Sequence, residues 1–439
     1  MTLIRWKKES LILFIGDFIC FIAALWLTLF IRYPQDSSGL IFIEHIKPFS
    51  SIFLIWAMVF FIAGLYEKQT NALKNKLLPL IVKTQFINIL IAIVFFYFLP
   101  FYSITPKVNL FIYIFLSAPL IVIWRTMLVD AVYVGRRENV LFIGDEPEVA
   151  ELVGEINENE NYKMKALTAK DFDNEILNEV PKSIFVIVTD LRKVGARAVN
   201  FNRLPELLFA GVKFVDIRDF YENVFKRIPL SSVNESWFLE NVSGARKIVY
   251  DFLKRVMDIV VCIFLGAAMF LVYPFVYVAI KREDGGSVIF SQDRIGKDNK
   301  TMRIFKFRSM NVMDGGRWLT VSDARVTRVG RFLRRTRIDE LPQAWNILRG
   351  DISLVGPRPD ALDLGNSLKV EIPYYAMRNL IKSGLSGWAQ THQNLPPQSV
   401  TETRERLAYD FYYLKNRSFL LDLEIALKTI KTLLSRAGL

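Results

Sequence analysis

The run VMDIVVCIFLGAAMFLVYPFVYVAI, residues 256–280, decides the fold class of this chain. It exceeds the roughly 20 apolar residues that a helix needs to cross a bilayer core. Lys254-Arg255 precede it and Lys281-Arg282 follow it, so the preference of positive charge for the cytoplasm predicts that both ends lie on that side. Pro274 removes a backbone donor and bends a helix. We therefore predict a re-entrant membrane helix over 256–280, broken at Pro274; a kinked fifth span is the alternative.

Four further apolar stretches precede this run and predict a four-span helical bundle over residues 1–135. Positive residues gather before the first stretch, between the second and third, and after the fourth, which predicts cytoplasmic ends for the bundle. Asp17 lies inside the first stretch, and we predict that a neighbouring helix satisfies it by a hydrogen bond; an intramembrane functional carboxylate is the alternative. The stretches are Leu11 to Ile31, Phe49 to Leu65, Leu77 to Leu99 and Leu110 to Leu128.

Composition narrows the chemistry that the 439 residues can support. Hydrophobic residues make up 52% of the chain while its net charge is +12, which favours a membrane protein with anionic lipid or phosphorylated substrates over a nucleic-acid binder. The two cysteines lie in apolar runs, which leaves no disulfide framework or Cys/His metal cluster, and of the two histidines His45 is predicted in a loop between spans. Acid, base or nucleophile must therefore come mainly from carboxylates.

Residues 136–225 change to a soluble α/β pattern. Strands are predicted at Val140–Ile143, Ile184–Val188 and Val212–Val215, with helices at Pro147–Ile156 and Leu204–Ala210. This alternation predicts a small parallel sheet of Rossmann type, followed by a linker over 226–253. The first turn, Gly144-Asp145-Glu146-Pro147, lacks the glycine pattern that lets a backbone approach a pyrophosphate. We interpret this domain as structural or regulatory, with nucleotide binding as the alternative.

Two basic clusters follow the re-entrant run. In Arg303 to Met310 cationic and apolar side chains alternate as in a half-buried strand, with Lys306 and Arg308 on one face. From Arg325 to Arg337 six arginines recur at helical spacing beside apolar residues. Such a helix suits anionic headgroups, or some of its arginines bind a phosphate. A solvated strand edge and a solvated helix face are the plain alternatives.

Two adjacent carboxylates, Asp339 and Glu340, follow directly. Pro342 is tolerated only in a first helical turn and Gly350 is a natural stop, so a helix is predicted to begin at about Asp339. A helix N-terminus favours ionised carboxylates and incoming phosphates. Asp339 is then a candidate nucleophile toward phosphorus, and Glu340 a candidate ligand of a divalent cation. Simple helix capping by Asp339 is the alternative.

The segment after this helix, Asp351 to Pro359, predicts a short strand and a rigid turn. Pro357 and Pro359 flank Arg358 and restrict its backbone. A purely structural turn does not need an arginine there. We therefore expect the Arg358 guanidinium to be held ready for a phosphate.

Taken together, these motifs resemble those of the bacterial sugar transferases, the monotopic phosphoglycosyl transferases. The resemblance covers about Lys254 to the C-terminus, and the upstream bundle and α/β domain resemble the large form of that family. Its ordered motifs are Lys306 to Met310, Arg328 to Arg334, Asp339 to Gln343, Gly350 to Pro359 and Gly387 to Gln390.

The resemblance implies a bacterial inner-membrane enzyme whose catalytic domain, residues 254–439, faces the cytoplasm. Asp339 would attack the β-phosphate of a UDP-sugar with Mg²⁺, release UMP and pass the phosphosugar to undecaprenyl phosphate, priming exopolysaccharide, capsule or O-antigen synthesis. Glu340 would be the metal or base partner. Apart from the resemblance, the four spans and the interposed soluble domain offer surface for a homodimer. The remaining site residues that the resemblance implies are the phosphate- or substrate-binding positions Arg334, Arg358, Lys306, Arg308, Pro357, Pro359 and Asp410.

Two competing hypotheses remain open at this point. In one, the chain is a membrane-bound sensor or scaffold whose α/β domain binds a nucleotide. In the other, the lipid phosphate attacks directly, without a covalent intermediate. The identity of the sugar does not follow from the sequence.

Overall fold

The computed structural model describes residues 2–35, 39–66, 74–98, 107–128, 138–159, 162, 164–169, 184–192, 204–209, 211–242, 247–310, 326–393 and 395–435. The chain divides into two compact units, Met1–Phe220 and Tyr221–Leu439. The domain limits predicted at residues 135, 225 and 253 stay predictions. Some of the positive residues between the second and third stretches and after the fourth, Lys68, Arg136 and Arg137, lie outside the described residues, as does Arg325 of the basic cluster.

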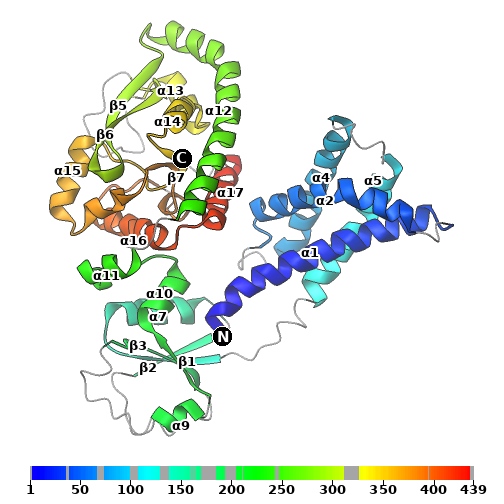
Figure 1. Cartoon of the computed structure of the whole chain (residues 1–439), viewed down its shortest axis with the longest axis horizontal. Helices are drawn as coiled ribbons and strands as arrows, with labels where there is room; N and C mark the ends of the chain where they lie inside the picture. Colours follow the sequence, from blue (N-terminus) through cyan, green and yellow to red (C-terminus); the bar gives the residue numbers. More distant parts are fainter. Residues whose placement is uncertain are drawn as a thin grey trace. The chain divides into compact units, whose positions relative to one another are not determined.

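Long apolar helices begin the first unit (Figure 1). Their length and composition suit a membrane span, although the span itself stays a prediction. The second helix starts nine residues before the predicted Phe49, so it includes Glu44 and Lys47. The elements are α1 (Thr2–Arg32), α2 (Leu40–Ile62), α4 (Lys74–Phe98), α5 (Lys107–Ile123) and the π-helix η1 (Trp124–Leu128).

The prediction of a loop around His45 is therefore wrong. His45 is buried inside α2, where its Nδ1 lies 2.8 Å from the Ile41 carbonyl and its Nε2 lies 3.2 Å from Asn109 Nδ2. These two contacts satisfy the ring inside an apolar bundle, and the second joins α2 to α5.

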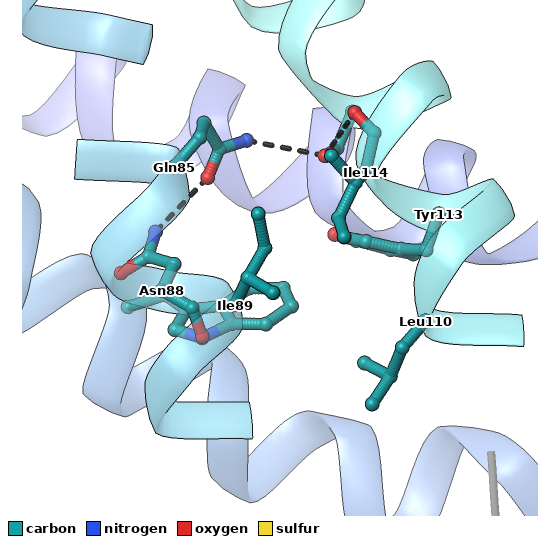
Figure 2. A pocket seen from close by; sticks show the side chains of 8 residues that line it. Gln85, Asn88, Ile89, Leu110, Tyr113 and Ile114 are labelled. Carbon is teal, nitrogen blue, oxygen red and sulfur yellow. Dashed lines mark hydrogen bonds between the residues drawn. The ribbon is translucent and has the colours of Figure 1, made fainter. Parts of the chain in front are cut away.

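Aromatic packing and a few polar contacts hold these helices together. Phe21, Phe53 and Trp56 lie in one buried cluster. Figure 2 shows a small hollow beside it, where Gln85 donates to Ser117 Oγ at 3.1 Å and accepts from Asn88 Nδ2 at 3.0 Å. Side-chain amides and hydroxyls commonly join helices in this way inside a membrane.

Asp17 is satisfied by a neighbouring helix, as predicted. Arg125 in η1 donates from Nε to Asp17 Oδ1 at 3.1 Å and from Nη1 to the Leu65 carbonyl at 2.6 Å. Both charged side chains are fully buried. The partner, Arg125, lies near the end of the fourth predicted stretch, and this pair ties α1 to η1, which follows α5.

The second part of this unit is a parallel sheet with strand order β2-β1-β3-β4. The predicted small parallel sheet is confirmed, but it contains a fourth strand, β2, that the sequence reasoning missed. Leu141, Ile187 and Leu207 lie in its core. The elements are β1 (Glu138–Ile143), α7 (Pro147–Glu158), β2 (Met164–Ala169), β3 (Ile184–Thr189), α9 (Leu204–Phe209), β4 (Lys213–Asp216) and α10 (Ile217–Phe225), the last of which continues into the second unit.

The second unit packs small sheets and several helices against the long helix α12. An antiparallel pair, β5 and β6, and a parallel pair, β7 and β8, form its sheets. Its elements are η4 (Leu230–Ser232), α11 (Glu235–Asn241), α12 (Ile248–Glu283), β5 (Ile289–Ile295), η5 (Lys297–Asn299), β6 (Thr301–Phe307), α13 (Arg328–Arg335), η6 (Ile338–Glu340), α14 (Gln343–Arg349), β7 (Ser353–Val355), α15 (Leu362–Glu371), η7 (Tyr375–Leu380), β8 (Gly384–Ser386), η8 (Ala389–Thr391), α16 (Val400–Asn416) and α17 (Phe419–Ser435).

Helix α12 contacts the same folded body at both of its ends. Near its start, Lys254 Nζ donates to the Val355 carbonyl at 2.8 Å. Near its end, Ile280 packs with Phe307 and Leu333. Figure 1 shows the axis of α12 changing direction in the later part of the helix. The helix contains Pro274, and a proline inside a helix removes a backbone donor and bends it.

The middle of α12 presents a broad apolar surface. Phe264, Phe270 and Phe275 are 71%, 81% and 77% exposed. Large apolar side chains exposed together on one helix indicate a surface that another apolar phase covers.

Candidate active site

Asp339 and Glu340, called the dyad below, lie on the 3₁₀ turn η6. A helix was predicted to begin at about Asp339; a short 3₁₀ helix does begin at Ile338, but the α-helix α14 begins only at Gln343. The chain turns sharply before the dyad: Arg337 adopts the left-handed conformation with φ 56°. The predicted stop is confirmed, since Gly350 closes α14 with φ 84°. The dyad thus lies on a single 3₁₀ turn between α13 and α14 and not in the first turn of α14.

Glu340 is surrounded by cations from three different elements. Its Oε1 lies 3.1 Å from Arg358 Nη2, 3.4 Å from Lys306 Nζ and 3.7 Å from Arg337 Nη1. Burial acts to raise the pKa of Glu340, but Arg358, Lys306 and Arg337 outweigh it and lower this pKa to about 2. Glu340 is therefore ionised throughout the physiological range.

Asp339 has a different environment from its neighbour. It is buried, and its Oδ1 has no hydrogen-bond partner among the residues that the structure describes. Burial, and after it the charge of Glu340, raise the pKa of Asp339 to about 6. Two adjacent carboxyls with pKa values this far apart typically have different chemical roles.

A buried carboxylate beside a carboxylate that three cations surround is an arrangement that suits phosphate chemistry. A buried carboxylate oxygen without a donor costs free energy until a ligand or cation reaches it. Lys306, Arg337 and Arg358 are partly exposed, at 22%, 43% and 30% of their side chains, so they can also meet an incoming anion. The hollow between α4 and α5 has neither a carboxylate nor a cation among its lining residues.

Arg358 projects from a turn whose backbone is held at three successive carbonyls. The carbonyl of Pro357 accepts from Gly384 N at 3.0 Å, that of Arg358 from Arg378 Nη2 at 2.9 Å, and that of Pro359 from Arg294 Nη1 at 2.9 Å. The two prolines thus contribute carbonyl anchors and fixed φ angles and do not touch the dyad in any described hydrogen bond.

Three predicted site residues lie apart from the dyad. Arg334 Nε donates to Ser309 Oγ at 3.0 Å, and Arg334 reaches Asp339 only through its charge, which acts to lower the Asp339 pKa. Arg308 pairs with Asp284 at 3.0 Å. Asp410 is buried and pairs with Arg378 at 2.7 Å.

The sequence reasoning missed Arg378, Asp360, Asn346 and Arg294. Asn346 is fully buried and ties α14 to β6, since its Nδ2 donates to the Arg303 carbonyl at 2.7 Å and its Oδ1 accepts from Phe305 N at 3.1 Å. Arg378 had one visible signal: it is a charged residue directly after the apolar and aromatic run Tyr374 to Met377.

Comparison with known proteins places the site in a family. The model described as "Bacterial sugar transferase" matches residues 249–436. The UDP-N-acetylgalactosamine-undecaprenyl-phosphate N-acetylgalactosaminephosphotransferase of Aeromonas hydrophila is 37% identical over 258 residues, which cover 57% of this chain and 59% of that protein. The UDP-glucose:undecaprenyl-phosphate glucose-1-phosphate transferase of Escherichia coli K12 is 38% identical over 182 residues, or 40% of this chain and 39% of that protein. These two alignments therefore leave much of each relative unmatched.

A shorter relative is covered further. The UDP-glucose:undecaprenyl-phosphate glucose-1-phosphate transferase of Caulobacter vibrioides is 39% identical over 193 residues, which are 43% of this chain and 72% of that protein. Since most of the Caulobacter protein aligns with this chain at that identity, and the whole dyad region lies in the matched segment, the chain belongs to the bacterial sugar transferases.

Proposed function

We propose that this chain transfers a sugar phosphate from a UDP-sugar to undecaprenyl phosphate and releases UMP, as a phosphoglycosyl transferase that primes an exopolysaccharide, capsule or O-antigen. The names of the relatives supply the two substrate classes. The observation that carries the proposal is Asp339 Oδ1, a buried carboxylate oxygen without a described partner, beside Glu340, whose pKa nearby cations lower.

The proposed reaction has two displacements at one phosphorus. An oxygen of ionised Asp339 attacks the β-phosphorus of the UDP-sugar, and the bond to the bridging oxygen breaks, so that UMP leaves with the electron pair. An oxygen of undecaprenyl phosphate then attacks the same phosphorus, and Asp339 leaves as a carboxylate. Arg358, Lys306 and Arg337 offset the phosphate charge in both steps.

Mg²⁺ fits the dyad as part of this proposal. Magnesium is commonly held by one or two carboxylates together with substrate phosphates, and Asp339 offers an oxygen that lacks a donor. Asp339 and Glu340 are the residues that would hold it. When bound, the ion neutralises diphosphate charge.

We also propose that α12 enters the cytoplasmic leaflet and returns, that α1, α2, α4 and α5 span the inner membrane, and that the α/β domain is a structural or regulatory domain of Rossmann type. Both ends of α12 contact one folded body, whereas a helix that crosses the roughly 30 Å bilayer core has its ends on opposite sides of the membrane, where one water-exposed body cannot contact both. The exposed phenylalanines of α12 supply the apolar surface for the leaflet.

A test of the reaction uses the purified chain without lipid acceptor. We expect UDP-sugar of the right kind to release UMP in an amount stoichiometric with the protein, and its labelled sugar to remain covalently on the chain. A panel of UDP-sugars identifies the donor, and chelation of divalent cations should stop the release. If UMP appears only after undecaprenyl phosphate is added, attack is direct; if no UDP-sugar yields UMP under either condition, the chain is a scaffold.

The course of α12 is tested by cysteine labelling in intact cells. In a chain whose Cys20 and Cys262 are replaced by alanine, single variants Asp251→Cys and Ser287→Cys report the two ends of α12. We expect a membrane-impermeant maleimide to label neither until the inner membrane is permeabilised. Ser38→Cys, in a predicted outer loop, is the positive control. Labelling of Ser287→Cys in intact cells would show a crossing helix.

A further inference from the structure

A buried ionic cluster of Arg378, Asp410, Asp360 and Arg406 contacts the backbone of the turn that carries Arg358. Arg378 and Asp410 are each 1% exposed, and Asp360 is 8% exposed. Arg378 Nε donates to Asp410 Oδ2 at 2.8 Å, and its Nη1 pairs with Asp360, which also accepts from Arg406. Each of the two arginines thus has a carboxylate partner, and the cluster of four charges is neutral as a whole.

Stability alone does not account for this cluster. Burying ions costs several kcal/mol per ion, and apolar residues of similar volume often serve a core as well or better. The cluster does something that apolar residues cannot do: Arg378 Nη2 donates to the Arg358 carbonyl at 2.9 Å. Among the described hydrogen bonds, this is the one that reaches the backbone of Arg358 itself, between the anchored carbonyls of Pro357 and Pro359.

We propose that Arg378, oriented by Asp360 and Asp410, is a positioning residue that fixes the backbone of Arg358 so that its guanidinium meets Glu340 and the substrate phosphate. Asp410 then acts through Arg378 and not as a substrate ligand. The inference rests on the proposed function, because it assigns Arg358 to phosphate binding.

The geometry gives each member a distinct task. Asp360 is the residue directly after Pro357-Arg358-Pro359, so its contact with Arg378 holds the C-terminal end of this turn. Asp410 comes from the middle of α16 and sets the angle of the guanidinium through Nε. A lysine at position 378 keeps the charge but has one nitrogen, so it cannot reach both carboxylates and the Arg358 carbonyl together.

The test is a double-mutant cycle with Arg378→Lys, Arg358→Ala and the double variant, measured as UMP release against UDP-sugar concentration. We expect Arg378→Lys to raise KM about tenfold with a smaller loss in kcat, because a misplaced Arg358 weakens phosphate binding. In the Arg358→Ala background the same change should cost nothing further. The control is Lys415→Gln. Lys415 lies on α16, as Asp410 does, and its ion pair with Glu222 of α10 is lost in this variant, which should leave KM unchanged.

A second readout does not need activity. Hydrogen exchange at the amides of Gly356, Arg358 and Asp360 should accelerate in Arg378→Lys and stay unchanged in Lys415→Gln. Losses that multiply in the double variant, or unchanged exchange in the turn, would overturn the positioning role. If wild type releases no UMP, the proposed function fails, and if Arg358→Ala leaves KM unchanged, the assignment of Arg358 to phosphate binding fails. In either case the exchange measurement still decides whether Arg378 holds the turn.

Discussion

Asp339→Asn is expected to abolish UMP release and at the same time to make the protein more stable at neutral pH. Asparagine is isosteric but cannot form the acyl phosphate, so we expect a loss of at least about 10³-fold and no covalent labelling by UDP-sugar. The stability gain follows from the pKa of Asp339, which burial and then Glu340 raise to about 6 in the folded protein from 3.8.

The sign follows from proton binding. The folded state holds this proton more tightly than the unfolded chain, so its stabilisation is complete below pH about 4 and is lost as the pH rises through about 6. Above pH 7 the ionised, buried Asp339 therefore destabilises the fold by roughly 2 to 3 kcal/mol. Thermal unfolding of Asp339→Asn without divalent cations should show a higher melting temperature at pH 8 and no difference at pH 4.

The matched control for this variant is Asp363→Asn, an exposed acidic residue on α15. It should change neither activity nor melting temperature. In the wild type, the rate of UMP release should fall about tenfold per pH unit below pH 6, since only ionised Asp339 is a nucleophile. A melting temperature that Asp339→Asn lowers at pH 8 would contradict the environment assigned to this carboxyl.

Glu340→Gln is expected to reduce UMP release by about 10²-fold or more while leaving Asp339 easier to ionise. The variant removes the one anion that Arg358, Lys306 and Arg337 share, so these cations repel one another and lose their alignment. The charge of Glu340 is also the second cause that raises the pKa of Asp339. Without it, the acid limb of the residual activity should move below pH 6.

The measurement is the rate of UMP release by Glu340→Gln as a function of pH. The control is Glu371→Gln, at an exposed position on α15. Two results would count against the assigned role of Glu340. One is a rate close to that of the wild type, and the other is an acid limb that moves to higher pH.

Much of the fold could be predicted because its signals are local. The runs that form α1, α4 and α5 are continuous and apolar, and β1 and β3 are short apolar strands. The missed strand β2 is different: it lies at the edge of the sheet, and its Lys165 and Thr168 dilute the apolar pattern. The early start of α2 was missed for a similar reason, since contacts inside the bundle and not hydropathy hold His45 in the helix.

The candidate site could be predicted only in part. The adjacent carboxylates and the proline-flanked arginine stand out in the sequence, and the structure brings Glu340, Lys306 and Arg358 together. The rest depends on contacts between distant positions. Arg378 meets Asp410, 32 residues away, and no local pattern indicates this contact. Likewise, the left-handed backbone of Arg337 separates the dyad from α13 and has no residue-type signal.

The anchored carbonyls of Pro357, Arg358 and Pro359 also bear on ligand capture. Ordering a mobile arginine around an anion normally subtracts from affinity at every encounter, because rotational freedom is lost when the complex forms. In this turn the backbone of Arg358 already loses most of its conformational entropy when the chain folds, so this loss does not recur at each binding event. Fewer contacts are therefore needed to bind the diphosphate of the proposed substrate.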